Sequence, residues 1–122
     1  MSAALGGIVG IFEMPNTNPL TTTPEALEHK IKRGTETAYT DFAYYFGGTF
    51  ENSKNLPLWE KLDGVCGIKI FMGASTGNLL SATDEEVEAV VANGNRVIAV
   101  HAEDEFLMLS LIHISEPTRR AL

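Results

Sequence analysis

The sequence has few cysteines, few cationic side chains and no long apolar run. Its one cysteine, Cys66, stands in an apolar segment, so an intrachain disulfide is excluded and we expect a buried, inert thiol. Nine Lys and Arg are outnumbered by 16 Asp and Glu, and the net charge of -7 argues against nucleic acid as a partner. No stretch approaches the roughly 20 apolar residues of a membrane helix, and the N-terminus lacks the pattern of a signal peptide. We therefore expect a cytoplasmic protein that binds neither nucleic acid nor membrane.

The composition is that of a globular domain: of 122 residues, 44% are hydrophobic and 20% are charged. The segment LSLIHISEPTR, from Leu109 to Arg119, resembles the translation of an adapter used to prepare sequencing libraries. We expect residues 109–122 to be a non-native tail, which removes His113 and Glu116 from the candidate site residues. The domain is then residues 1–108. Its first residues, Ser2 to Gly7, have the pattern of a helix end without the helix before it, which predicts a fragment.

Short apolar segments alternate with segments of helical pattern. Parallel strands are predicted at four places, and the first is expected to be buried on both faces: Ile8–Glu13, Asp41–Thr49, Val65–Met72 and Arg96–His101. Strands that alternate with helices indicate βαβ units and a parallel sheet of the α/β class. Four strands fit half of a (β/α)₈ barrel as well as a small doubly wound sheet.

Capping residues and spacing predict the intervening helices. Thr23 can cap the first helix, with Pro24 in its first turn and Gly34 at its end. Leu58 and Leu62 are spaced as on a short second helix. The third helix begins at a capping box and ends near a glycine, with a stripe of valines between them: Thr83, Glu86, Val87, Val90, Val91 and Gly94.

Lys69 stands within an otherwise apolar strand. Alternation places it on one face with Gly67 and Phe71, and the aliphatic side chains on the other face. In a barrel the aliphatic face packs on helices, so Lys69 points into the interior, near the carboxyl end where barrel enzymes hold their sites. A desolvated, neutral amine can react with carbon dioxide to give a carbamate that bridges two metal ions. An ion pair, or an edge strand whose lysine reaches water, remains an alternative.

Other polar residues follow the strand ends. His101 closes the last strand and precedes a run of acidic residues, which is a pattern typical of a metal ligand and equally of a structural histidine. Asn16, in the loop MPNTNP after the first strand, could bind a carboxylate or simply form a turn. The loop 73–77, GASTG, lacks the lysine of a phosphate-binding loop.

Four segments are together similar, in order and spacing, to the second to fifth strands of bacterial dihydroorotases: GGIVGIFEMPNTNP, DFAYYFGGTFEN, GIKIFMGASTGNLL and RVIAVHAEDE. The resemblance covers Ser2 to Glu105 and implies part of a (β/α)₈ barrel of the metal-dependent amidohydrolase type. The MPNTNP and GIKIFMGASTG motifs favour dihydroorotase over allantoinase and dihydropyrimidinase, which carry other residues after the Met-Pro.

The resemblance also implies a chemistry and a site. Carboxylated Lys69 matches the lysine that bridges two zinc ions, His101 matches a metal-binding histidine, and Asn16 matches an asparagine that binds the substrate carboxylate. The family reversibly hydrolyses the cyclic amide of dihydroorotate to N-carbamoyl aspartate in pyrimidine biosynthesis, and the parent is expected to be a homo-oligomer.

No counterparts are found for the paired histidines of the family's first strand, its substrate-binding arginine, its later histidine or its aspartate that shuttles the proton. We therefore expect the chain alone to be inactive. A non-catalytic amidohydrolase-like scaffold subunit and another cyclic amidohydrolase are the alternatives.

Overall fold

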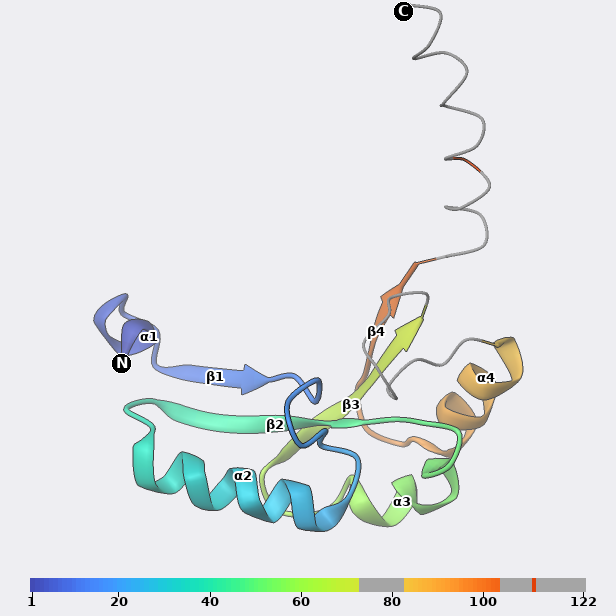
Figure 1. The fold of residues 1–122 in the computed structure, drawn as a ribbon, viewed down its shortest axis with the longest axis horizontal. Coiled ribbons are helices and arrows are strands. Elements are labelled where there is room, and N and C mark those ends of the chain that lie inside the picture. Colours follow the sequence, from blue (N-terminus) through green and yellow to red (C-terminus); the bar gives the residue numbers. More distant parts are fainter. Residues whose placement is uncertain (73–82, 104–110, 112–122) are drawn as a thin grey trace, which may run out of the picture.

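A computed structural model describes residues 1–72, 83–103 and 111 of the chain (Figure 1). Its four strands form one parallel sheet in chain order: β1 (Gly10–Glu13), β2 (Asp41–Gly47), β3 (Val65–Met72) and β4 (Ile98–Ala102). The helical segments are α1 (Ser2–Leu5), α2 (Pro24–Thr37), η1 (Ser53–Asn55), α3 (Leu56–Trp59) and α4 (Asp84–Asn93). The arrangement is a half-barrel with helices between its strands, which confirms the predicted fold class.

The core lies between the sheet and helices α2, α3 and α4. Each helix contributes one side chain that is fully or almost fully buried: Leu27 from α2, Leu56 from α3 and Val90 from α4. The sheet contributes buried side chains of β2 and β3: Tyr44, Phe46, Val65, Ile68 and Ile70. The aliphatic face of β3 therefore packs on the helices, as the alternation of its residues predicted.

Strand β1 is the one strand whose predicted burial is wrong. All four of its residues are exposed, and Phe12 keeps 66% of its surface accessible. It is an edge strand, bonded to β2 alone in the described sheet, whereas the apolar run suggested cover on both faces. The strand is also shorter than predicted, because pairing begins only at Gly10.

The helix starts agree with prediction better than the helix ends. The hydroxyl of Thr23 accepts a hydrogen bond from the N–H of Ala26, and Thr83 and Glu86 form the capping box. Gly34 does not end α2, which continues to Thr37. The predicted short helix is present as α3, but it ends before Leu62, and its buried leucine is Leu56, whereas Leu58 is 71% exposed.

Two of the remaining expectations are modified. Val91 is 48% exposed, so the valine stripe of α4 buries Val90 fully and Val87 in part. Cys66 is half-buried, and burial raises the pKa of its thiol, which fits an unreactive side chain. None of the helices in the described part is long and apolar enough to cross a membrane.

Glu60 joins two segments at the amino ends of β3 and β4. Its buried carboxylate accepts hydrogen bonds from the N–H groups of Asn95 and Arg96, at 2.9 and 3.0 Å. The Arg96 guanidinium donates in turn to the carbonyl of Val65, at 2.6 Å. These bonds fix the turn from which β4 starts, so they set where the rest of that strand lies.

Candidate functional site

Lys69 lies on the face of β3 that is turned away from the helices. Its neighbours Ile68 and Ile70 are fully buried in the helix-covered core, so alternation places Lys69 on the opposite face. The side chain is half-buried, and its Nζ lies 5.1 Å from the centre of the Phe71 ring. Among the described residues no carboxylate lies within ion-pair distance of Lys69, so the ion-pair alternative has no support there.

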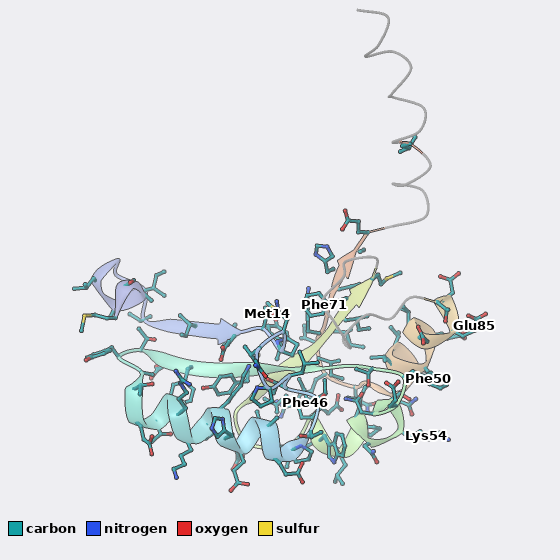
Figure 2. All side chains as sticks on the ribbon, viewed as in Figure 1. Met14, Phe46, Phe50, Lys54, Phe71 and Glu85 are labelled. Atoms are coloured by element: carbon teal, nitrogen blue, oxygen red, sulfur yellow. The ribbon has the colours of Figure 1, made fainter. Side chains whose placement is uncertain are left out.

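His101 lies beside Lys69 on the neighbouring strand. The register pairs Lys69 with Ala99 and Phe71 with His101, and paired residues of a sheet share a face. The rings of Phe71 and His101 have their centres 6.3 Å apart. The structure therefore brings the two predicted metal ligands together around one aromatic ring, toward the carboxyl ends of β3 and β4 (Figure 2, which labels Phe71).

Glu103 is the acidic residue that contacts the histidine. Its Oε2 lies 3.3 Å from Nε2 of His101, and both side chains are partly exposed. The carboxylate can orient the imidazole and leaves Nδ1 without a hydrogen bond to the described residues. Of the acidic residues that follow His101 in the sequence, Glu103 is the one that the structure shows in contact with the ring. Asp104 and Glu105 lie outside the described residues, as does the loop 73–77.

The neighbours of Lys69 across the sheet are the smallest available. Register places Gly47 of β2 on one side of it and Ala99 of β4 on the other. Glycine and alanine are too small to cover the lysine, so these two neighbours do not obstruct a carboxyl group on its amine. Two ligands do not make a closed site: no cluster of three or more His, Cys, Asp and Glu lies within residues 1–72, 83–103 and 111.

Asn16 lies in the loop that leaves the carboxyl end of β1. Its side chain is exposed, whereas the adjacent Pro15 and the later Thr21 are buried. The carbonyl of Pro15 accepts hydrogen bonds from the N–H groups of Thr17 and Thr21, at 2.9 and 3.0 Å, which closes the loop at its base. Asn16 thus lies at the same rim of the sheet as Lys69 and His101, with β2 between β1 and β3.

Asn52 is a polar residue of this rim that the sequence did not single out. Its buried side chain connects the loop after β1 with the end of β2 by hydrogen bonds of 3.1 and 2.8 Å, to the carbonyls of Thr22 and Gly47. The Thr49-x-x-Asn52 spacing is a local signal for the two bonds between these residues, but nothing local indicates the bond to Thr22, which joins residues 30 positions apart.

A cavity of about 390 Å³ lies elsewhere, between α2 and the outer face of β1 and β2. Lys30 lies at this cavity and contacts Glu13 at 3.6 Å and the Tyr44 ring at 5.3 Å. Burial lowers the pKa of Lys30, and the charge of Glu13 opposes that shift. Because the cavity opens on the helix-bearing face, it is not part of the site around Lys69.

The chain resembles known proteins of one chemical class. It is 39% identical over 116 residues to an L-hydantoinase of Paenarthrobacter aurescens and 36% identical over 113 residues to a dihydroorotase of Methanosarcina acetivorans. An allantoinase of Arabidopsis thaliana is 35% identical over 111 residues. These matches cover 85–90% of this chain and 22–25% of the relatives. The chain therefore spans about a quarter of the length of the curated relatives it matches.

The fold comparison agrees with the sequences. A solved structure of the L-hydantoinase (dihydropyrimidinase) from Arthrobacter aurescens superposes with a TM-score of 0.78 at 37% identity, over 90% of this chain and 25% of that one. No protein-family model matches the chain. The relatives and the shared half-barrel identify the chain as homologous to about a quarter of the length of cyclic amidohydrolases.

Proposed function

We propose that the protein is part of a zinc-dependent dihydroorotase, which reversibly hydrolyses the cyclic amide of dihydroorotate. The observation that carries the proposal is the placement of Lys69 and His101 on one sheet face around Phe71, at the carboxyl ends of adjacent strands. In (β/α) barrels this is the end at which active sites are built. The whole reaction needs residues beyond the two ligands, so the activity belongs to the complete enzyme.

Each candidate residue has a distinct role in this proposal. Carboxylated Lys69 would bridge two zinc ions, and His101 would bind one of them through a ring nitrogen. Bound zinc would supply a Lewis acid that polarises the ring amide carbonyl. The exposed amide of Asn16 would donate hydrogen bonds to the substrate carboxylate from the same rim.

The choice of dihydroorotate among cyclic amides rests on two supports. Dihydroorotases of several organisms are among the relatives, at 32–36% identity. The MPNTNP loop also has an exposed asparagine, Asn16, whose amide can donate hydrogen bonds to a carboxylate. The 39% identity to an L-hydantoinase favours a second candidate, hydrolysis of a hydantoin ring at the same site.

A hybrid enzyme tests the proposal. The segment of the Methanosarcina acetivorans dihydroorotase that aligns with this chain is replaced by the chain's own residues. We expect the hybrid to bind zinc and to hydrolyse dihydroorotate in preference to hydantoin and allantoin. Lys69→Ala and His101→Ala are expected to lower kcat/KM on the order of 100-fold or more and to reduce the zinc content, because each removes a metal ligand.

Matched substitutions on α2 provide the controls. Lys32 and His29 are exposed on the far side of the sheet from the site, so Lys32→Ala and His29→Ala should leave activity and zinc unchanged. Preference of the hybrid for hydantoin or allantoin would move the substrate assignment to those enzymes. Full activity and full zinc content in the Lys69→Ala hybrid would overturn the metal site itself.

A further inference from the structure

The Asn52 side chain is buried where two rim loops meet, and all of its hydrogen-bonding groups are used. Its Oδ1 accepts from the N–H of Thr49 at 2.9 Å, while its Nδ2 donates to the carbonyls of Thr22 and Gly47. The residue as a whole is only 6% exposed. A buried amide that satisfies three backbone groups holds those groups in fixed relative positions.

One of these bonds extends toward Lys69 through a single peptide group. The carbonyl of Gly47 and the N–H of Gly48 belong to the same planar unit. Its carbonyl accepts from Asn52 at 2.8 Å, and its N–H donates to the carbonyl of Lys69 at 2.9 Å. Residue 48 must be a glycine in this position, because a Cβ there would lie 2.5 Å from the Val90 side chain and 3.0 Å from that of Ile68. A continuous chain of hydrogen bonds thus joins Asn52 to the backbone of the candidate bridging lysine.

The other donor bond of Asn52 fixes the loop that carries Asn16. The carbonyl of Thr22 accepts from Asn52, and the carbonyl of Thr21 accepts from the N–H of Gly47 at 2.8 Å. Lys30 fixes the opposite end of the loop by donating to the carbonyl of Met14 at 3.2 Å. With both ends held, the position of Asn16 relative to β2 depends on Asn52.

We propose that Asn52 is a positioning residue that sets the Asn16 loop and the Lys69 strand relative to one another; this rests on the proposed function of that site. The amide is chemically suited to the task, because it combines one acceptor with two donors. Aspartate would keep the acceptor for Thr49 but lose both donors. An apolar residue would leave three backbone groups without partners.

Amide hydrogen exchange in the full 122-residue chain tests the coupling without any catalysis. For each amide, the exchange rate in Asn52→Asp is compared with the rate in the unsubstituted chain. We expect the rates of the Thr21, Gly47 and Gly48 N–H groups to rise about tenfold more than those of β4, because buried hydrogen bonds are lost. Asn55→Asp is the matched control, because Asn55 is exposed and makes no side-chain cap bond; it should leave these amides unchanged.

Two further variants keep the exchange test decisive. Val65→Ala weakens the core at the amino end of β3 and should speed exchange across the sheet without singling out the rim. If Asn52→Asp does not fold, Thr49→Ala loosens the turn that holds Asn52, and the same three amides should exchange faster by a smaller factor. If the exchange rates of Thr21, Gly47 and Gly48 rise no more than those of β4 in a folded variant, the coupling is overturned.

Kinetics of the hybrid enzyme then separate positioning from mere stability. In that hybrid, Asn52→Asp should raise KM for dihydroorotate about as much as Asn16→Ala does. In the double variant, the fold-increase in KM should be smaller than the product of the two single increases. A purely structural role would lower the active fraction and leave KM unchanged, which would refute positioning. An unsubstituted hybrid without any activity would instead refute the proposed function, and the exchange result would still stand.

Discussion

Glu60 is a buried carboxylate whose charge is held by backbone dipoles. Burial alone would raise its pKa, but the N–H groups of Arg96 and Asn95 outweigh that effect and lower the pKa below the ordinary value of 4.5. A group whose pKa is lowered in the folded state stabilises the fold above its unfolded pKa. That stability is lost as the pH falls through the folded value.

Glu60→Gln should therefore lower the free energy of unfolding at neutral pH by about 1–3 kcal/mol, since a charged acceptor of two buried N–H groups is replaced. The substituted chain should also lose less stability than the unsubstituted one as the pH falls below about 4.5. Urea unfolding at a series of pH values measures both effects. Glu88→Gln, on the exposed side of α4, is the control; an equal pH dependence in both variants would contradict this role of Glu60.

Individual residues differ in how far the sequence reveals them. Lys69 and His101 could be predicted, because a charged residue in an apolar strand and a histidine at a strand end are visible in the local pattern. Asn52 and Glu60 could not, because Asn52 binds the carbonyl of Thr22, 30 positions away, and both N–H partners of Glu60 lie 35 and 36 positions away. A local pattern carries no record of such partners.

Among the elements, α2 shows how packing overrides local propensity. A glycine commonly ends a helix, but Gly34 lies within α2, where a Cβ would lie 2.5 Å from the Tyr44 hydroxyl and 2.7 Å from the Phe42 ring. The glycine is present because helix and strand approach closely at this point. The close approach also lets the Tyr44 hydroxyl donate to the carbonyl of Lys30 at 2.8 Å.

Gly34→Ala should consequently destabilise the protein by about 1–3 kcal/mol, although alanine favours the helical backbone. The added methyl group must displace two aromatic side chains that belong to the core or pack against it. Thermal unfolding by circular dichroism measures the change. Glu36→Ala, exposed on the same helix, should be neutral or slightly stabilising. An increase in melting temperature for Gly34→Ala would show that the close approach tolerates a side chain.

The number and order of the strands were predicted more reliably than the burial of their side chains. The limits of β3 agree with its apolar run, because both of its edges are paired and its outer face is buried. Strand β1 has an equally apolar run but lies at an edge, where Ile8, Val9 and Phe12 stay exposed. The periodicity of apolar residues indicates which side chains can be buried. Whether they are buried depends on which strands and helices lie beside them in the complete sheet.

At the scale of the whole molecule, both edges of the described sheet carry exposed apolar side chains. Val9 and Phe12 are 83% and 66% exposed near β1, and Val97 and Val100 are 67% and 43% exposed at β4. Edge strands with free backbone groups and apolar side chains invite pairing with another chain. We therefore expect the isolated chain to associate as its concentration rises.

Sedimentation velocity over a range of concentrations measures this association. Val9→Lys together with Val97→Lys should shift the population toward the monomer, because charges on edge strands oppose pairing. Leu58→Lys changes an equally exposed residue on α3, away from both edges, and should have no such effect. A chain that stays monomeric without substitution at high concentration would contradict the expected association.

The order of the strands in the sheet is also their order in the chain, and every strand pairs with the one synthesised just before it. During translation, each strand therefore leaves the ribosome next to a partner that is already available. Among the described strands, each pairing closes only the connection between neighbours in the chain. The half-barrel can thus grow from its N-terminal edge, one strand and one helix at a time.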